Sequence, residues 1–168
     1  MARSLNILFL LTLLMLLVTL PARSAERFTG RVVHVADGDT VTVLTDARRE
    51  VKVRLHGIDC PESAQPFGQA AKRTTLSLAA NQSVAVVPVD TDRYGRTVGE
   101  VFLSDGTSLN RALVWAGYAW WYRRYAPNDI DLEGLEQAAR AERRGLWAED
   151  RPVPPWEWRK ARSGQKKE

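Results

Sequence analysis

One stretch of the chain decides how the rest is interpreted, and it reads Val53-Arg54-Leu55-His56-Gly57-Ile58-Asp59-Cys60-Pro61-Glu62. Residues 51–55 alternate between apolar and polar side chains, which predicts a strand with one buried face. Gly57 and Pro61 then break the strand into a loop that carries Asp59 and Glu62. The guanidinium of Arg54 and two carboxylates therefore converge beyond the end of a strand. Phosphodiester hydrolysis uses such groups, because it needs a cation for the phosphate, a metal ligand and a base for water.

Length and composition indicate a single globular domain. The chain has 168 residues, of which 45% are hydrophobic and 26% are charged. This length allows one domain with a real core and leaves little room for a second. Cys60 is the only cysteine, so an internal disulfide is excluded and stability must come from the core or from a bound metal.

The N-terminus has the pattern of a signal peptide over residues 1–24. Arg3 gives it a positive start, residues 8–20 are almost wholly apolar, and small residues surround position 24. We expect cleavage after Ser24, with cleavage after Ala25 as the alternative. An uncleaved anchor helix is disfavoured, because the apolar run is short for a bilayer span. Both interpretations predict export to a secreted or periplasmic location, with membrane contact only during export or if the signal stays uncleaved.

The net charge of +4 is concentrated at the C-terminus. Residues 151–168 carry six basic and two acidic side chains, whereas residues 1–150 carry 18 of each kind. The body of the protein is therefore not a polycation that coats nucleic acid by charge alone. Any phosphate recognition in the body must come from a few placed arginines.

The order of the expected elements indicates the fold class. β-branched and apolar residues are concentrated in the stretches 28–36, 40–44, 51–55, 83–89 and 97–103, which predict five strands. Helical spacing begins at Pro66, at Leu109 and after Asn128, which is a candidate helix cap. Strands interrupted by one helix and followed by two more predict an α+β fold, a five-stranded OB-fold-like β-barrel with about three packed α-helices.

These elements place one domain at residues 25–150 and an extension at residues 151–168. The extension is rich in proline and then in basic residues. We expect Trp156 and Trp158 to pack, because exposed tryptophans are costly, and the charges after them to be solvated. A disordered basic arm is the alternative.

Four separated motifs carry the chemistry of the domain. They are Asp37-Gly38-Asp39-Thr40, then Arg54 with Asp59 and Glu62, then Asp92-Arg93-Tyr94-Gly95-Arg96, and an aromatic run that ends at Tyr125-Ala126-Pro127. Each motif alone is weak, since Asp-Gly is first of all a turn signal. In this order and at these spacings, the four resemble the staphylococcal nuclease (thermonuclease) family over roughly residues 27–150.

The resemblance implies an OB-fold barrel that carries a Ca²⁺-dependent phosphodiesterase with DNA and RNA as substrates. It implies that the carboxylates of Asp39 and Asp59, with the backbone carbonyl of Cys60, hold the Ca²⁺. Two carboxylates and one carbonyl leave several coordination positions for water and phosphate. We therefore expect weak binding, on the order of 10⁻⁴ to 10⁻³ M.

The same resemblance assigns three catalytic residues. Glu62 is implied as the general base that acts on the attacking water, and Arg54 and Arg96 as the clamp on the phosphate. The chemistry agrees, because attack on a phosphodiester adds negative charge that guanidinium groups stabilise. Arginine suits this role, since its planar fork meets two phosphate oxygens and keeps its proton.

Nucleotide contacts are implied for Arg93, Tyr94 and Tyr125. The chain departs from the family at two places. Cys60 stands where the best-known member has a threonine, and Arg123 replaces the first tyrosine of the nucleotide pocket. We expect Ca²⁺ binding to survive the first change, because the ligand there is a backbone carbonyl, and base stacking to differ through the second.

The main alternative is a non-catalytic OB-fold module that binds nucleic acid. Such a module would typically lack Asp39, Asp59 and Glu62, because carboxylates repel a phosphate unless a cation intervenes. His34 and His56 are interpreted as structural, which disfavours a histidine-based nuclease. We expect a monomer without an obligate protein partner.

Overall fold

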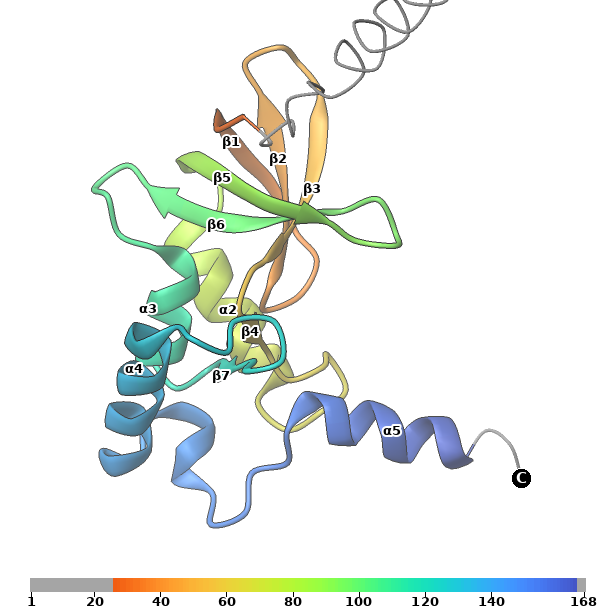
Figure 1. The fold of residues 1–168 in the computed structure, drawn as a ribbon, viewed down its shortest axis with the longest axis vertical. Helices are drawn as coiled ribbons and strands as arrows, with labels where there is room; N and C mark the ends of the chain where they lie inside the picture. Colours follow the sequence, from red (N-terminus) through yellow and green to blue (C-terminus); the bar gives the residue numbers. More distant parts are fainter. Residues whose placement is uncertain (1–25, 166–168) are drawn as a thin grey trace, which may run out of the picture.

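Residues 26–165 are described by the computed structural model, and five of their strands close into a barrel (Figure 1). The barrel strands are β1 (Phe28–Val35), β2 (Thr40–Thr45), β3 (Glu50–Leu55), β5 (Ser83–Thr91) and β6 (Thr97–Leu103). They follow the order β1-β2-β3-β6-β5, in which β3 and β6 are parallel and the other neighbours are antiparallel. The predicted α+β fold with a five-stranded barrel is confirmed.

Valines fill the interior of the barrel, because alternate residues of a strand face the same side. Each barrel strand contributes at least one that exposes 1% or less of its surface: Val32, Val41, Val43, Val53, Val86 and Val101. Burial of one such side chain contributes about 1.5–3 kcal/mol. In β3, Arg54 lies between the buried Val53 and Leu55. Its side chain therefore points to the opposite face.

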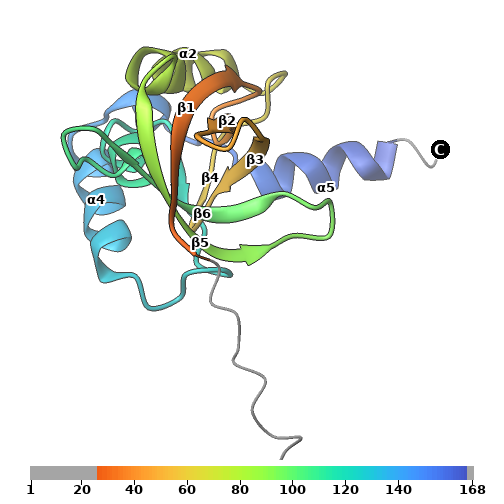
Figure 2. The same cartoon turned by 90° about the horizontal axis from the view of Figure 1, so that it is seen from above.

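Four α-helices and one 3₁₀ helix accompany the barrel within the described residues. They are α2 (Gly68–Ala79), α3 (Leu109–Trp115), α4 (Ile130–Ala141), the 3₁₀ helix η1 (Gly145–Ala148) and α5 (Pro155–Gln165). Figure 2 shows α2 lying across the barrel next to β1 and α5 projecting away from the other helices. The fourth α-helix, α5, lies in the extension, where the sequence predicted no helix.

One local expectation was wrong. The cap of α4 is Asp129 rather than Asn128, because the Asp129 carboxylate accepts a hydrogen bond from the backbone N–H of Leu132 at 3.0 Å.

A small second sheet carries one of the candidate site residues. Its strands are β4 (Ile58–Asp59) and β7 (Trp120–Trp121), and Asp59 pairs with Trp120. The backbone N–H of Trp121 donates to the buried carboxylate of Glu136 at 3.1 Å, which ties β7 to α4. Asp59 therefore lies on a strand, where a loop was expected.

Within residues 26–165, no helix combines the length and the apolar character that a bilayer crossing requires. The signal peptide expected at residues 1–24 lies outside the described residues. Its presence and cleavage stay predictions.

Candidate active site

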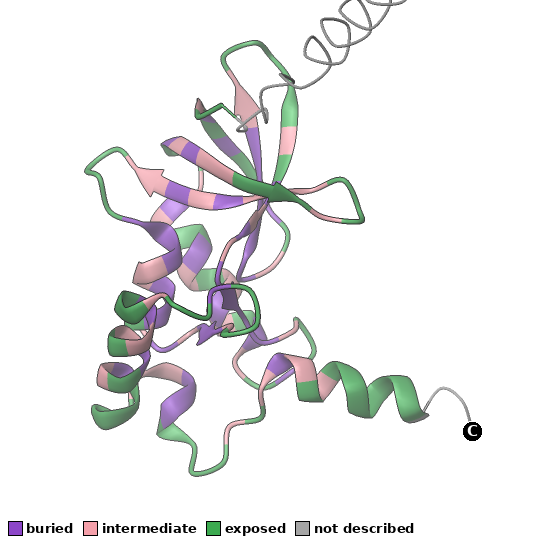
Figure 3. Ribbon diagram, in the orientation of Figure 1, coloured by how far each residue is buried: buried purple, intermediate pink, exposed green. Residues whose placement is uncertain are grey.

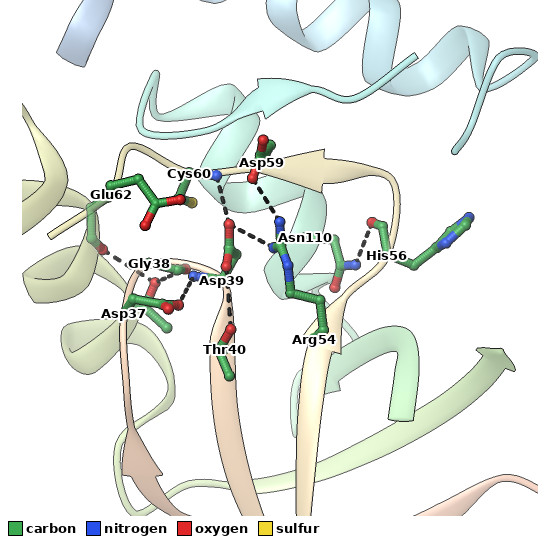
Figure 4. Close-up of polar contacts among 12 residues, drawn as sticks. Asp37, Gly38, Asp39, Thr40, Arg54, His56, Asp59, Cys60, Glu62 and Asn110 are labelled. Atoms are coloured by element: carbon green, nitrogen blue, oxygen red, sulfur yellow. Dashed lines mark hydrogen bonds and ion pairs between the residues drawn. The ribbon is translucent and has the colours of Figure 1, made fainter. Parts of the chain in front are cut away.

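The turn between β1 and β2 places Asp39 at the edge of the barrel (Figure 4). The backbone N–H of Asp39 donates to the Asp37 carboxylate at 3.1 Å, and its carbonyl accepts from the N–H of Leu55 at 2.9 Å. The Asp39 carboxylate accepts a 2.6 Å hydrogen bond from the backbone N–H of Cys60. The turn is thus tied to the end of β3 and to the loop after β4.

Gly38 is required in this turn because the chain passes close to two other segments. A Cβ at this position would lie 2.7 Å from the Cβ of Cys60 and 2.8 Å from the Cβ of Ala71 in α2. The carbonyl of Gly38 also accepts a 2.6 Å hydrogen bond from the hydroxyl of Thr75, which is fully buried. Helix α2 therefore holds the position of the Asp39 carboxylate.

Arg54 lies between two buried aspartates, as Figure 4 shows. Its Nη1 is 2.6 Å from Oδ2 of Asp39, and its Nη2 is 2.7 Å from Oδ1 of Asp59. The side chain of Asp59 is only 1% exposed and that of Arg54 15%. One guanidinium placed between two carboxylates reduces their mutual repulsion, which would be strong in a buried position. The structure thus brings together Asp39, Arg54 and Asp59, three residues that the sequence singled out.

Glu62 lies in the loop that leads from β4 to α2. Its backbone N–H donates to the side-chain carbonyl of Gln65 at 3.1 Å. The backbone carbonyl of Glu62 lies so close to Gly68 that a Cβ added at position 68 would overlap the carbonyl oxygen. The backbone of Glu62 is therefore fixed, while its side chain is 42% exposed and can reach water at the edge of the site.

Burial controls the protonation of two groups at the site. It raises the pKa of Asp39 to about 7, and the nearby Arg54 guanidinium offsets only part of this effect. Burial also raises the pKa of the Cys60 thiol well above its usual range, and the Asp39 carboxylate adds to the increase. The thiol therefore stays protonated, so Cys60 can offer a metal its backbone carbonyl but not a thiolate.

Arg96 approaches the same edge from the turn before β6. Its Nε lies 2.7 Å from Oδ2 of Asp92, and its Nη1 lies 3.5 Å from the hydroxyl of Thr40. That hydroxyl is 3.3 Å from the Asp39 carboxylate. The side chain of Thr40 therefore links the guanidinium of Arg96 to the carboxylate of Asp39. The Arg96 side chain is 28% exposed, so some of its N–H donors are accessible to a ligand.

The three residues expected to contact the nucleotide lie on the surface. Tyr94 and Tyr125 are 68% and 61% exposed. Arg93 donates to the Tyr94 hydroxyl at 2.6 Å, and the Arg96 guanidinium lies 5.6 Å from the Tyr94 ring centre. Tyr125 packs edge-on against Tyr122 at 5.0 Å between ring centres. Exposed rings beside guanidinium groups can stack on bases.

Helix α5 adds to the site a residue that the sequence analysis missed. Arg159 places Nη2 2.7 Å from Oδ2 of Asp59 and Nη1 2.6 Å from Oε1 of Glu62. The expectation that the charges of the extension are solvated is therefore wrong for Arg159. One signal was present: Trp156 and Arg159 are three residues apart, so a helix would place both on one face.

Gln65 is a second residue that the sequence analysis missed. It is 6% exposed, accepts from the N–H of Glu62, and donates from Nε2 to the carbonyl of Val153 at 2.6 Å. Gln65 thereby joins the loop of Glu62 to the segment that leads into α5. No pattern in the sequence distinguishes this glutamine.

The donor set at this edge fits a weakly held hard cation. Among residues 26–165 there is no group of three or more His, Cys, Asp and Glu side chains arranged to share a metal. Instead, the buried carboxylates of Asp39 and Asp59 lie on either side of one guanidinium, and a second guanidinium lies between Asp59 and Glu62. Carboxylate oxygens are the ligands that Ca²⁺ and Mg²⁺ prefer, with water completing the coordination.

A barrel that presents paired buried aspartates, an accessible glutamate and several arginines at one edge is suited to a hydrolase that acts on phosphodiesters. The model of the family described as staphylococcal nuclease homologue matches residues 52–149. The chain belongs to this family and is a nuclease, so the resemblance stated from the sequence is confirmed.

Curated relatives with nuclease names share most of the chain. A micrococcal nuclease of Shigella flexneri is 40% identical over 155 residues, which cover 87% of this chain and 87% of the relative. An uncharacterized endonuclease of Escherichia coli O157:H7 is 45% identical over 130 residues, which cover 77% of this chain and 84% of the relative. A staphylococcal-like nuclease of Arabidopsis thaliana is 37% identical over 116 residues, 69% of this chain and 35% of the relative.

Proposed function

We propose that this protein is an exported, Ca²⁺-dependent nuclease that hydrolyses DNA and RNA. The observation that supports this most directly is the bridge of Arg54 between the buried carboxylates of Asp39 and Asp59, next to the accessible Glu62. A barrel that only binds nucleic acid has no use for buried acidic groups at its binding edge, because they repel phosphate. Export is proposed from the apolar N-terminal stretch alone.

In this proposal, Asp39, Asp59 and the backbone carbonyl of Cys60 hold the Ca²⁺. Once bound, Ca²⁺ would supply a Lewis acid for a phosphate oxygen. The turn of Gly38 and the pairing of β4 with β7 fix the two carboxylates before any ligand arrives. Such preorganisation means that little reorganisation is needed when the substrate binds.

Three side chains act on the phosphate and the water. Glu62 accepts the proton of the attacking water, because its side chain is the accessible carboxylate of the site. Arg54 and Arg96 stabilise the charge that develops on the phosphate oxygens. A guanidinium has five N–H donors, and Arg54 directs two of its nitrogens to carboxylates at 2.6 and 2.7 Å. Its other donors remain for phosphate.

The nucleic acid substrate is expected to be positioned by exposed side chains beside the site. The rings of Tyr94 and Tyr125 can stack on bases, while Arg93 lies next to Tyr94 and offers positive charge to the phosphate backbone. The body of the chain carries equal numbers of acidic and basic side chains. Binding therefore depends on these placed groups more than on overall charge.

Glu62→Gln is expected to separate binding from cleavage. The variant should lose about 10²- to 10⁴-fold in cleavage rate, because water then lacks its proton acceptor. It should still bind single-stranded DNA and RNA in the presence of Ca²⁺, as measured by fluorescence anisotropy. If the unmodified protein binds both substrates under these conditions but cuts neither, the protein is a nucleic-acid-binding module instead.

Stabilisation by Ca²⁺ is expected to grow with pH. Because the pKa of Asp39 is raised in the folded protein, folding takes up a proton between the ordinary pKa of aspartate and about 7. The metal-free protein should therefore lose stability as the pH rises through this window. Ca²⁺ binds the ionised carboxylate, so it should raise the Tm more at pH 8 than at pH 5.

Thermal unfolding with Ca²⁺ and with chelator at the two pH values measures this effect. Asp39→Asn is the control, because it removes the titrating group and should flatten the pH dependence of the metal-free protein. An equal Tm increase at pH 5 and pH 8 in the unmodified protein would exclude Asp39 as a ligand of the cation.

A further inference from the structure

The guanidinium of Arg159 contacts both Asp59 and Glu62, the residues proposed as metal ligand and general base. Its Nη2 is 2.7 Å from Oδ2 of Asp59, while Nη1 is 3.3 Å from Oδ1 of Asp59 and 2.6 Å from Oε1 of Glu62. The Nη2 of Arg54 is 2.7 Å from Oδ1 of Asp59. Both oxygens of this buried carboxylate are thus bound to guanidinium groups.

Arg159 is held in place through the first turn of α5. The Trp156 ring stacks on Tyr122 with 4° between the planes and 5.1 Å between the centres, and meets Trp120 edge-on at 5.6 Å. Gln65 binds the carbonyl of Val153 just before the helix. The contacts of Trp156 orient the helix so that Arg159, three residues further on, faces the site.

The rest of α5 is loosely attached. Figure 3 shows the helix exposed beyond its first turn, and residues 159–164 all belong to the exposed class. The side chain of Arg159 itself is 43% exposed. Few contacts would be lost if the part of α5 beyond its first turn moved aside, so the position of Arg159 can respond to what binds at Asp59.

A divalent cation and the Arg159 guanidinium cannot both bind the Asp59 carboxylate without strong electrostatic repulsion between them. Ca²⁺ lies about 2.3–2.6 Å from its oxygen ligands, whereas the Arg159 nitrogen lies 2.7 Å from the same carboxylate. The two positive charges would then be only a few ångströms apart at a buried group, where repulsion is strong.

We propose that Arg159 is an internal counter-ion of the nuclease site, which must leave Asp59 and Glu62 before Ca²⁺ can bind. This inference rests on the proposed function. While Arg159 is bound to Asp59 and Glu62, it neutralises the proposed metal ligand and the proposed general base. The apparent affinity for Ca²⁺ is then the intrinsic affinity of the site multiplied by the fraction of molecules in which Arg159 has moved away.

Ca²⁺ binding to the full chain, followed by isothermal titration calorimetry, tests the proposal. Arg159→Gln should lower the Kd for Ca²⁺ about tenfold, as expected if about a tenth of the unmodified molecules are open. Arg162→Gln is the matched control: it removes the same charge from the same helix, and Arg162 makes no ion pair among residues 26–165. Its Kd should stay within about twofold of the unmodified protein.

Hydrogen exchange provides a readout that does not depend on cleavage. Ca²⁺ should speed amide exchange in residues 155–164 of the unmodified protein and of Arg162→Gln, and should leave exchange in Arg159→Gln unchanged because Ca²⁺ then displaces no side chain of α5 from Asp59. Trp156→Ala should also lower the Kd for Ca²⁺, since it frees the helix without changing a charge.

The outcomes separate the two proposals. Equal Ca²⁺ affinity in the unmodified protein and Arg159→Gln would overturn the role of Arg159 and leave the Ca²⁺-dependent nuclease standing. An absence of Ca²⁺ binding in every variant would overturn both.

Discussion

Arg96→Ala is expected to lower turnover by about two to three orders of magnitude, because the loss of one donor to developing charge typically removes about 3–4 kcal/mol of transition-state stabilisation. The fold should remain intact. Arg96 and its partner Asp92 are 28% and 19% exposed, and ion pairs of this kind contribute only about 0–1 kcal/mol to stability. The kcat on single-stranded DNA and the far-UV circular dichroism spectrum measure the two effects.

Arg73→Ala is a suitable control for the loss of one positive charge. Arg73 is exposed on α2 and makes no ion pair among the described residues. Its kcat should match that of the unmodified protein. If Arg96→Ala keeps a kcat close to that of the control, Arg96 has no part in the reaction.

Arg54→Ala is expected to lower the stability of the fold as well as the turnover. The change leaves the carboxylates of Asp39 and Asp59 in a buried position without the guanidinium that lies 2.6 and 2.7 Å from them. Removal of one partner from a buried ion pair typically costs about 3–5 kcal/mol. Ca²⁺ should recover part of this loss, because a cation that binds the two carboxylates takes over the role of the missing charge.

Urea denaturation in excess chelator and in saturating Ca²⁺ measures the free energy of unfolding in each state. Arg96→Ala serves as the comparison, since it removes the same side chain from a more exposed pair. A loss below about 1 kcal/mol for Arg54→Ala in chelator, the range of a surface pair, would contradict the bridging role of Arg54.

Local sequence patterns were sufficient to predict most of the barrel. The alternation of residues 51–55 placed Arg54 on the face opposite Val53 and Leu55, and the Asp-Gly turn between β1 and β2 is where the sequence predicted it. These features depend on side-chain period and turn chemistry, which act between neighbours along the chain. Arg54 and Asp59 are five residues apart, so their proximity could also be predicted from the local sequence.

The parts that escaped prediction depend on contacts between distant residues. Asp59 and Arg159 are 100 residues apart. Their meeting requires η1, the segment before α5 and the stacking of Trp156 on Tyr122 to have their observed geometry. The strand that holds Asp59 has two residues and exists only because β7 pairs with it. The two-residue strand leaves no period or motif in the sequence, and the spacing of Trp156 and Arg159 indicates only a shared helix face.

The charge of the extension shows how composition can mislead. The six basic side chains after residue 150 suggested charges in contact with solvent or a disordered basic arm. One of the six, Arg159, instead binds two acidic groups of the nuclease site. Its position beside Asp59 follows from the packing of Trp156 on the same helical face, and the sequence did suggest that Trp156 packs.

The most direct test of the proposed Ca²⁺-dependent nuclease is the initial rate of single-stranded DNA cleavage by the purified protein. It is measured with millimolar Ca²⁺ and with excess chelator, at slightly alkaline pH where Asp39 is ionised. We expect cleavage with Ca²⁺ that disappears in chelator and returns when Ca²⁺ is restored. Cleavage that continues unchanged in chelator would contradict the assignment of Asp39 and Asp59 as ligands of a required metal.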